Sequence, residues 1–171
     1  MIAKFSNFKT RKMLADGIFM SKMVYLICIW SNCSKDLLTR LQSLQNKAAL
    51  IVTRNYRYNN SQENLKQSGW LSVKQLIFYH KVVQLHKIRE TKLPESLLEM
   101  YEWNYTYPTR QEAKGLIKPI GTPRLRTTQS SFRWSAAQCF NSLPQKLKLI
   151  KEGQKFKGEV KAWITENVPY K

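Results

Sequence analysis

The chain of 171 residues is 43% hydrophobic and 12% aromatic, which supplies a packed core and excludes a disordered basic tail. Twenty-nine Lys and Arg against eleven Asp and Glu give a formal net charge of +18. Such a charge favours a polyanionic partner, nucleic acid first, over the alternative of a basic surface that only keeps the protein soluble.

The positive charge is concentrated at the two ends of the chain. Residues 1–57 carry ten basic and two acidic side chains (+8), and residues 104–171 carry thirteen and four (+9). Residues 58–103 carry six and five (+1). We therefore divide the chain into three regions at these boundaries.

Two long helices are predicted in the first region. Residues 8–30 have apolar side chains on most sides, which is typical of a buried or sandwiched helix. Ser34 is placed to cap a second helix, and apolar residues follow it in alternating steps of four and three. This apolar seam consists of Leu37, Leu41, Leu44, Ala48 and Ile51. The short link at 31–33 predicts that the two helices form an antiparallel pair.

A basic row follows another line of the second helix. Arg40, Lys47 and Arg54 are spaced by seven residues, so they point in nearly the same direction about 10 Å apart. No acid lies on that line, and Asp36 is the only acid in the helix. The row is either an ordinary solvated face or a line of contacts to a phosphate backbone.

The central region is predicted to be helical throughout. Ser61 opens a short helix that ends at Gly69. Ser72 and Gln75 form a capping box for a helix that runs to about Glu90, whose apolar circumference indicates a central position. Another short helix runs from Pro94 to Met100.

The last region begins with a basic loop over residues 104–129, with short strand-like pieces at 116–120 and 124–127. Helical spacing returns in Phe132, Ala136 and Phe140, and a final amphipathic helix contains Phe156 and Ile164. The fold class is therefore mainly α. The candidate nucleic-acid-binding residues of this region are Arg110, Lys114, Lys118, Arg124, Arg126 and Arg133.

Catalytic chemistry is poorly supplied. The only aspartates, Asp16 and Asp36, are isolated, whereas two-metal phosphoryl transfer needs clustered carboxylates. His80 and His86 are out of line for a metal pair, and a hydrogen-bonded core histidine is the favoured interpretation of His80. We expect no catalytic residue, no metal site and no cofactor, and hence a binding module that is not an enzyme.

The cysteines and the apolar segments indicate the compartment. Three cysteines give no disulfide framework, so we expect an intracellular protein of the nucleus or cytoplasm. The most apolar stretch, residues 20–30, is shorter than the roughly 18 residues that a membrane span needs. We expect no membrane association.

Three blocks in series carry a resemblance to a known family. They are SKMVYLICIW with LQSLQNKAALIVT (21–30 and 41–53), GWLSVKQLIFY (69–79), and YPTRQ with SFRWSAAQCFNSLP and FKGEVKAWI (107–111, 131–144 and 156–164). In this order they resemble the segment after the palm in reverse transcriptases (RNA-directed DNA polymerases) of non-LTR, jockey-like retrotransposons. The resemblance covers nearly the whole chain.

The resemblance implies that residues 1–57 are similar to the thumb and residues 58–171 to the C-terminal extension. The palm, with its metal-binding aspartates, is then expected before residue 1, and this chain is a fragment without polymerase activity. Its partners are expected to be the backbone of RNA or of an RNA–DNA or DNA duplex, together with the polymerase palm. Tyr105, Tyr107 and Trp134 would stack on a flanking single strand, although core and loop anchoring is the favoured role for them.

Two other interpretations stay open. The chain is alternatively a helical protein–protein interaction module, with Trp70, Trp103 and the helix at 72–90 as its docking surface. It is otherwise a decayed element without a selected function.

Overall fold

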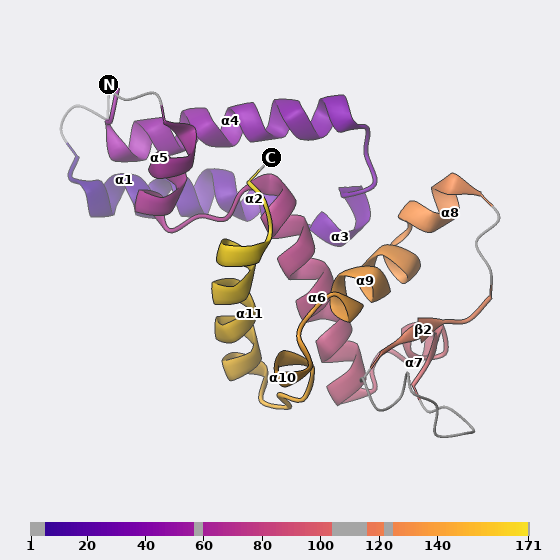
Figure 1. Ribbon diagram of the computed structural model, residues 1–171. Coiled ribbons are helices and arrows are strands. Elements are labelled where there is room, and N and C mark those ends of the chain that lie inside the picture. The colour runs from indigo at the N-terminus through magenta and orange to yellow at the C-terminus, as the bar shows by residue number, and fades with distance from the viewer. Residues whose placement is uncertain (1–5, 57–59, 104–115, 122–124, 171) are drawn as a thin grey trace. The chain divides into compact units, whose positions relative to one another are not determined.

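The structure, a computed structural model, describes all residues except 1–5, 57–59, 104–115, 122–124 and 171 (Figure 1). Within these residues the fold is mainly α, as predicted, with one antiparallel pair of two-residue strands. The chain divides into two compact units: unit 1 comprises residues 1–77 and 169–171, and unit 2 residues 78–168. The boundary between the units lies inside helix α6 (Val73–Thr91), and not at residues 57 and 103, where the charge density changes.

The first helical segment of unit 1 is interrupted. It consists of α1 (Phe8–Ala15), a π-helical turn η2 (Asp16–Met20), α2 (Ser21–Val24) and α3 (Ile27–Trp30). Leu26 adopts a left-handed conformation with φ 50°, which separates α2 from α3. The prediction of one continuous helix over residues 8–30 is therefore wrong. Because the π-helical turn is wider than an α-helical one, it also shifts which side chains share a face.

Helix α4 (Lys35–Thr53) follows, and its 19 residues lie wholly within unit 1. The Ser34 hydroxyl accepts a hydrogen bond from the Leu37 N–H at 3.4 Å, as expected of an N-cap. At the other end Arg54 takes a left-handed conformation with φ 57°. Figure 1 shows α1 and α4 side by side, with the chain running in opposite directions along them.

The buried face of α4 differs from the predicted apolar seam. Gln45, Ala49 and Val52 are 0% exposed, whereas Leu37, Leu44 and Ile51 are 47%, 50% and 50% exposed. Two buried polar groups explain the difference, because each satisfies a backbone carbonyl. The Gln45 amide donates to the Leu71 carbonyl at 2.8 Å, and the Arg11 guanidinium donates from Nε to the Val52 carbonyl at 2.9 Å. The helix is therefore rotated away from the orientation that its leucines alone predict.

Helix α5 (Ser61–Ser68) joins the end of α4 to α6. Asn60 caps its start, and Gly69, with φ 67°, ends it. The buried Asn64 accepts a hydrogen bond from the Thr53 hydroxyl at 3.1 Å, which ties α5 to the last turn of α4.

The predicted capping box at the start of α6 is confirmed. The Gln75 carboxamide oxygen accepts from the Ser72 N–H at 3.0 Å, and the Ser72 hydroxyl accepts from the Gln75 N–H at 3.3 Å. The helix extends to Thr91, one residue beyond the expected end.

Unit 2 is built around the second part of α6. Its helices α9 (Phe132–Asn141) and α11 (Gly153–Asn167) supply a core with α6, and the short α10 (Gln145–Lys148) joins them. The side chains of this core that are 0% exposed are Val82, Leu85, Ile88, Ala136, Phe140, Phe156, Val160 and Ile164. The apolar spacing that predicted the two C-terminal helices is thus the spacing that is buried.

Two strands and two further short helices complete the described part of unit 2. Strand β1 (Tyr101–Glu102) follows α7 (Glu95–Leu98) and pairs antiparallel with β2 (Lys118–Pro119). Asn141 holds the chain beside β2, since its side chain both accepts from the Ile117 N–H and donates to the Ile117 carbonyl, each at 2.8 Å. This pairing explains the strand-like piece predicted at 116–120.

The strand-like piece predicted at 124–127 is wrong where the structure describes it. Arg126 begins helix α8 (Arg126–Ser130), and only Leu125 is extended. The Leu125 carbonyl accepts from the N–H groups of Thr128 at 3.0 Å and Gln129 at 3.2 Å, so the chain turns into a helix directly after it.

Candidate nucleic-acid interface

The basic row of α4 is exposed, but its three members differ. Arg40 pairs with Asp36 one turn earlier, with 3.1 Å between Nε and Oδ2, and both side chains are about 70% exposed (73% and 69%). Asp36 lies off the seven-residue line but reaches its first member. The pair is weak, because exposed ion pairs contribute about 0–1 kcal/mol. Arg40 thus remains available for exchange with an external anion.

Lys47 and Arg54 complete the row. Both side chains are exposed, and no acidic residue in the described parts of the chain pairs with either. Lys47 lies in the regular part of α4, whereas Arg54 is the left-handed C-cap residue. Its side chain therefore departs from the seven-residue line that joins the other two.

The second basic region is only partly described. Arg110, Lys114 and Arg124 lie outside the described residues, as do Tyr105 and Tyr107. Arg126 is the first residue of α8. Lys118 is exposed on β2, and its Nζ lies 3.3 Å from Oε2 of Glu102 on the paired strand. Of these candidates, the structure therefore describes the side chain of Lys118 alone.

Arg133 makes hydrogen bonds within unit 2. It lies half-buried on α9, and its guanidinium donates to the carbonyls of Met100 and Ile120. These carbonyls directly flank the residues of the two strands. The prediction of Arg133 as a backbone contact for nucleic acid did not account for these bonds. An arginine fork can satisfy two carbonyls at once, and the role of Arg133 in nucleic-acid binding stays a prediction.

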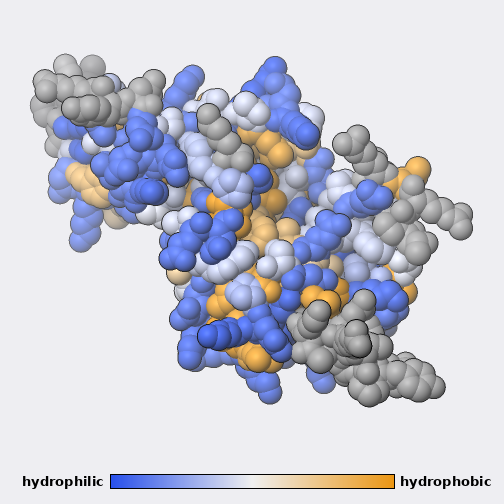
Figure 2. All heavy atoms as spheres, in the orientation of Figure 1, coloured by the Kyte–Doolittle hydropathy of each residue, from blue (hydrophilic) through white to orange (hydrophobic). Residues whose placement is uncertain are grey.

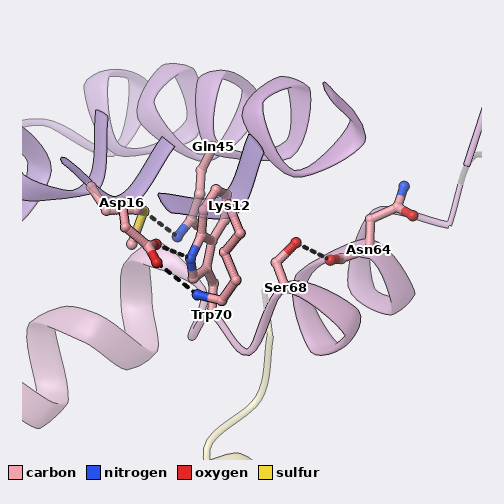
Figure 3. Close-up of polar contacts among 7 residues, drawn as sticks. Lys12, Asp16, Gln45, Asn64, Ser68 and Trp70 are labelled. Carbon is pink, nitrogen blue, oxygen red and sulfur yellow. Dashed lines mark hydrogen bonds and ion pairs between the residues drawn. The ribbon is translucent and has the colours of Figure 1, made fainter. Parts of the chain in front are cut away.

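A polar cluster joins the start of unit 1 to the segment before α6 (Figure 3). Oδ1 of Asp16 accepts from the Trp70 indole N–H at 2.7 Å, and Oδ2 of the same carboxylate accepts from Lys12 at 2.7 Å. The Gln45 amide points into the same region, 3.9 Å from the Met20 sulfur. Asp16 thus accepts hydrogen bonds from two donors, and one of these bonds fixes the position of the Trp70 indole.

The buried titratable groups of unit 2 are likewise engaged within the unit. The His86 imidazole is buried, stacks on Phe156 with 3.8 Å between ring centroids, and lies 2.7 Å from the Ile150 carbonyl. Burial lowers the pKa of His86 and also that of His80. Burial lowers the pKa of Lys148 too, whose ammonium donates to the Asn141 carbonyl at 2.8 Å. The hydrogen-bonded core histidine is therefore His86, while sequence had suggested His80.

Sequence reasoning missed an exposed apolar surface on unit 1. Along the first helical segment Met13, Ile18, Tyr25 and Ile29 are more than 60% exposed (66%, 63%, 71% and 69%). Figure 2 shows hydrophobic side chains breaking the hydrophilic surface over α1. The apolar character on most sides of residues 8–30 was the available signal. It was interpreted as evidence for burial, whereas half of it faces outward.

No protein-family model, curated protein or solved structure matches this chain. Among the described residues, no group of three or more His, Cys, Asp or Glu side chains is placed to hold a metal ion. No helix in the described ranges is both long and apolar enough to cross a membrane.

Proposed function

We propose that this chain is a helical nucleic-acid-binding module that grips a duplex by its phosphate backbone. The proposal follows the resemblance to the thumb and C-terminal region of non-LTR, jockey-like reverse transcriptases. In this role the module is the part of an RNA-directed DNA polymerase that holds the duplex, and the palm of that polymerase supplies the chemistry. It acts inside the cell, in the nucleus or the cytoplasm.

The observation that carries the proposal is the exposed basic row of α4 within a strongly basic unit. Unit 1 contains thirteen Lys and Arg and three acids, a net charge of +10. Arg40 and Lys47 are separated by about 10 Å along the helix, and phosphates follow one another every 3.4 Å or so along the axis of each strand. The two charges are therefore far enough apart to contact different phosphates of one strand. It presents no side chain arrangement that reads bases, so we expect binding indifferent to sequence.

Titration of a labelled RNA–DNA duplex by fluorescence anisotropy tests the proposal. We expect the logarithm of the affinity to fall with the logarithm of the salt concentration, at a slope of roughly −0.9 for each neutralised phosphate. The double variant Arg40→Gln and Lys47→Gln should reduce that slope by about two such steps.

The matched control is Lys66→Gln, which removes an exposed charge of unit 1 from α5 and leaves the row intact. This control should lower the affinity less than either substitution in the row. Absence of binding at low salt would overturn the proposal. If the double variant of the row lowers the affinity no more than the Lys66 control does, then α4 does not contact the duplex.

A second function, protein docking, is favoured by one specific observation. Eleven of the fifteen large hydrophobic side chains that are exposed in the described residues belong to unit 1. Exposed apolar side chains that gather on one part of a protein mark interaction surfaces. Sedimentation velocity of the chain separates the two functions, because docking through apolar surface persists at high salt and phosphate contacts do not.

A further inference from the structure

The outer surface of α4 carries two parallel rows of different chemistry. One is apolar and consists of Leu37, Leu44 and Ile51, each about half exposed (47%, 50% and 50%). The other is the basic row. Each apolar side chain is three residues before a basic one, so the two rows are neighbours along the helix surface.

The apolar row has the spacing of a helix–helix seam. With the half-buried Leu41 and Ala48 between them, these residues follow alternating steps of four and three, which is the heptad repeat of two helices packed along their length. In that repeat Leu37, Leu44 and Ile51 occupy one core position and Leu41 and Ala48 the other. We call these five residues the α4 seam.

The two flanks of the α4 seam are not equivalent. One flank, at Gln45 and Val52, is 0% exposed because unit 1 itself covers it. The other flank carries Arg40 and Lys47, which are both exposed, and the exposed Arg54 follows directly after the last residue of the helix. A helix laid on the seam therefore meets apolar side chains along its centre and positive charges along its open edge.

We infer that the α4 seam is the docking site for an acidic amphipathic helix of a partner protein. Flanking positions of paired helices choose the partner through opposite charge, and this flank is wholly basic. A helix with apolar residues at heptad spacing and Glu beside them complements both rows at once. This goes beyond the binding of nucleic acid, and it makes Arg40 and Lys47 shared between two ligands.

Two other occupants fit the seam less well. A second copy of the chain in antiparallel orientation would set one basic flank against the other, and in parallel orientation would set it against the covered flank of Gln45 and Val52. A nucleic-acid backbone offers phosphates to the basic row but leaves the leucines uncovered, since its outer surface is charged.

The test uses the full chain and two labelled peptides of three heptads. Both have Leu at the core positions, and one has Glu and the other Lys at the flanking positions. We expect the Glu peptide to bind in an anisotropy titration and the Lys peptide not to bind. The double variant Leu44→Ser and Ile51→Ser should weaken the Glu peptide about tenfold or more. Lys47→Glu should weaken binding of the Glu peptide and strengthen binding of the Lys peptide.

The control is Leu149→Ser, which replaces a side chain of unit 2 that is 70% exposed and should change nothing. Circular dichroism verifies that each variant keeps its helix content. The inference is overturned if the Glu peptide does not bind, or if the serine variant binds it unchanged. Two other results also overturn the inference. The first is a dimer, seen by sedimentation, that the serine variant abolishes and the Glu peptide does not disrupt. The second is binding to anionic lipid vesicles that the serine variant abolishes and the Glu peptide does not inhibit.

The RNA–DNA duplex distinguishes this inference from the proposed function. Duplex affinity should follow Lys47 and be indifferent to Leu44 and Ile51, and excess Glu peptide should displace the duplex. If the wild-type chain does not bind the duplex, the proposed function is overturned, whereas the peptide result still supports this inference. Equal loss of duplex and peptide affinity in the serine variant would instead assign the seam to nucleic acid.

Discussion

The two units use their hydrophobic residues in opposite ways. Among the described residues unit 2 buries thirteen hydrophobic side chains and exposes four large ones, whereas unit 1 buries ten and exposes eleven. Each unit has a core, but many of the large apolar side chains of unit 1 lie outside its core. Unit 2 therefore buries most of its large apolar side chains, whereas unit 1 buries some of them and exposes the others.

Polar groups mark the same difference. In unit 1 the buried Gln45 and Arg11 hold α4 through backbone carbonyls, and this turns its leucines outward. In unit 2 the aromatic rings of Phe140 and Phe156 occupy the centre, with 6.4 Å between their centroids. An apolar centre fixes a helix by its hydrophobic face, and a polar one fixes it by hydrogen bonds. The apolar pattern therefore predicts orientation in unit 2 and misleads in unit 1.

The largest expected effect is a core truncation in unit 2. Phe156→Ala should lower the free energy of unfolding by about 3–5 kcal/mol, because it removes a fully buried ring and leaves a cavity. Leu44→Ala on the half-exposed row of unit 1 should cost less than about 1 kcal/mol. Urea denaturation followed by circular dichroism measures both. A cost for Leu44→Ala of the same size as for Phe156→Ala would show that the α4 seam is buried.

A smaller effect is expected from exchanging polar and apolar residues on α4. Gln45→Leu should destabilise the protein by about 1–3 kcal/mol although it adds hydrophobicity, because the Leu71 carbonyl loses its buried donor. The neighbouring Leu44→Gln should be close to neutral. Urea titrations of the two variants compare their free energies of unfolding. If Gln45→Leu stabilises the protein, then the hydrogen bond from Gln45 does not determine which face of α4 is buried.

Arg133 separates stability from binding. Arg133→Gln should lower the free energy of unfolding by about 1–2 kcal/mol, since the Ile120 carbonyl loses its arginine donor and the Met100 carbonyl keeps only the Ile120 N–H. The salt dependence of duplex binding should stay as in the wild type. If instead the slope falls as it does for Lys47→Gln, then Arg133 contacts phosphate in the complex.

The smallest effect is expected from pH. Burial lowers the pKa of His86 and of His80 in the folded protein, so the unfolded chain binds their protons more readily. Stability from these groups is complete above the unfolded pKa of about 6.5 and declines as the pH falls below it. Urea midpoints at pH 7.5 and 5.5 measure the decline, and His86→Gln should reduce it. A midpoint that rises on acidification would contradict the direction.

The sequence alone determined the mainly α fold, the helix starts at Ser34 and Ser72, and the buried faces of α9 and α11. These depend on local signals, since a cap is a contact between residues three apart and an apolar stripe is a property of one helix. The binding role of Arg40 and Lys47 stays a prediction. Arg110, Lys114 and Arg124 lie outside the described residues.

Only the tertiary structure decided which face of α4 is buried and which basic residues belong to the fold. Gln45 reaches Leu71, and Arg133 reaches Met100 and Ile120, across separations of 26, 33 and 13 residues. No local pattern records such bonds, because a buried polar group is stable only where the rest of the chain places an acceptor for it. The Gln45 bond, together with the bond from Arg11 to the Val52 carbonyl, turned the apolar row of α4 outward beside its basic row.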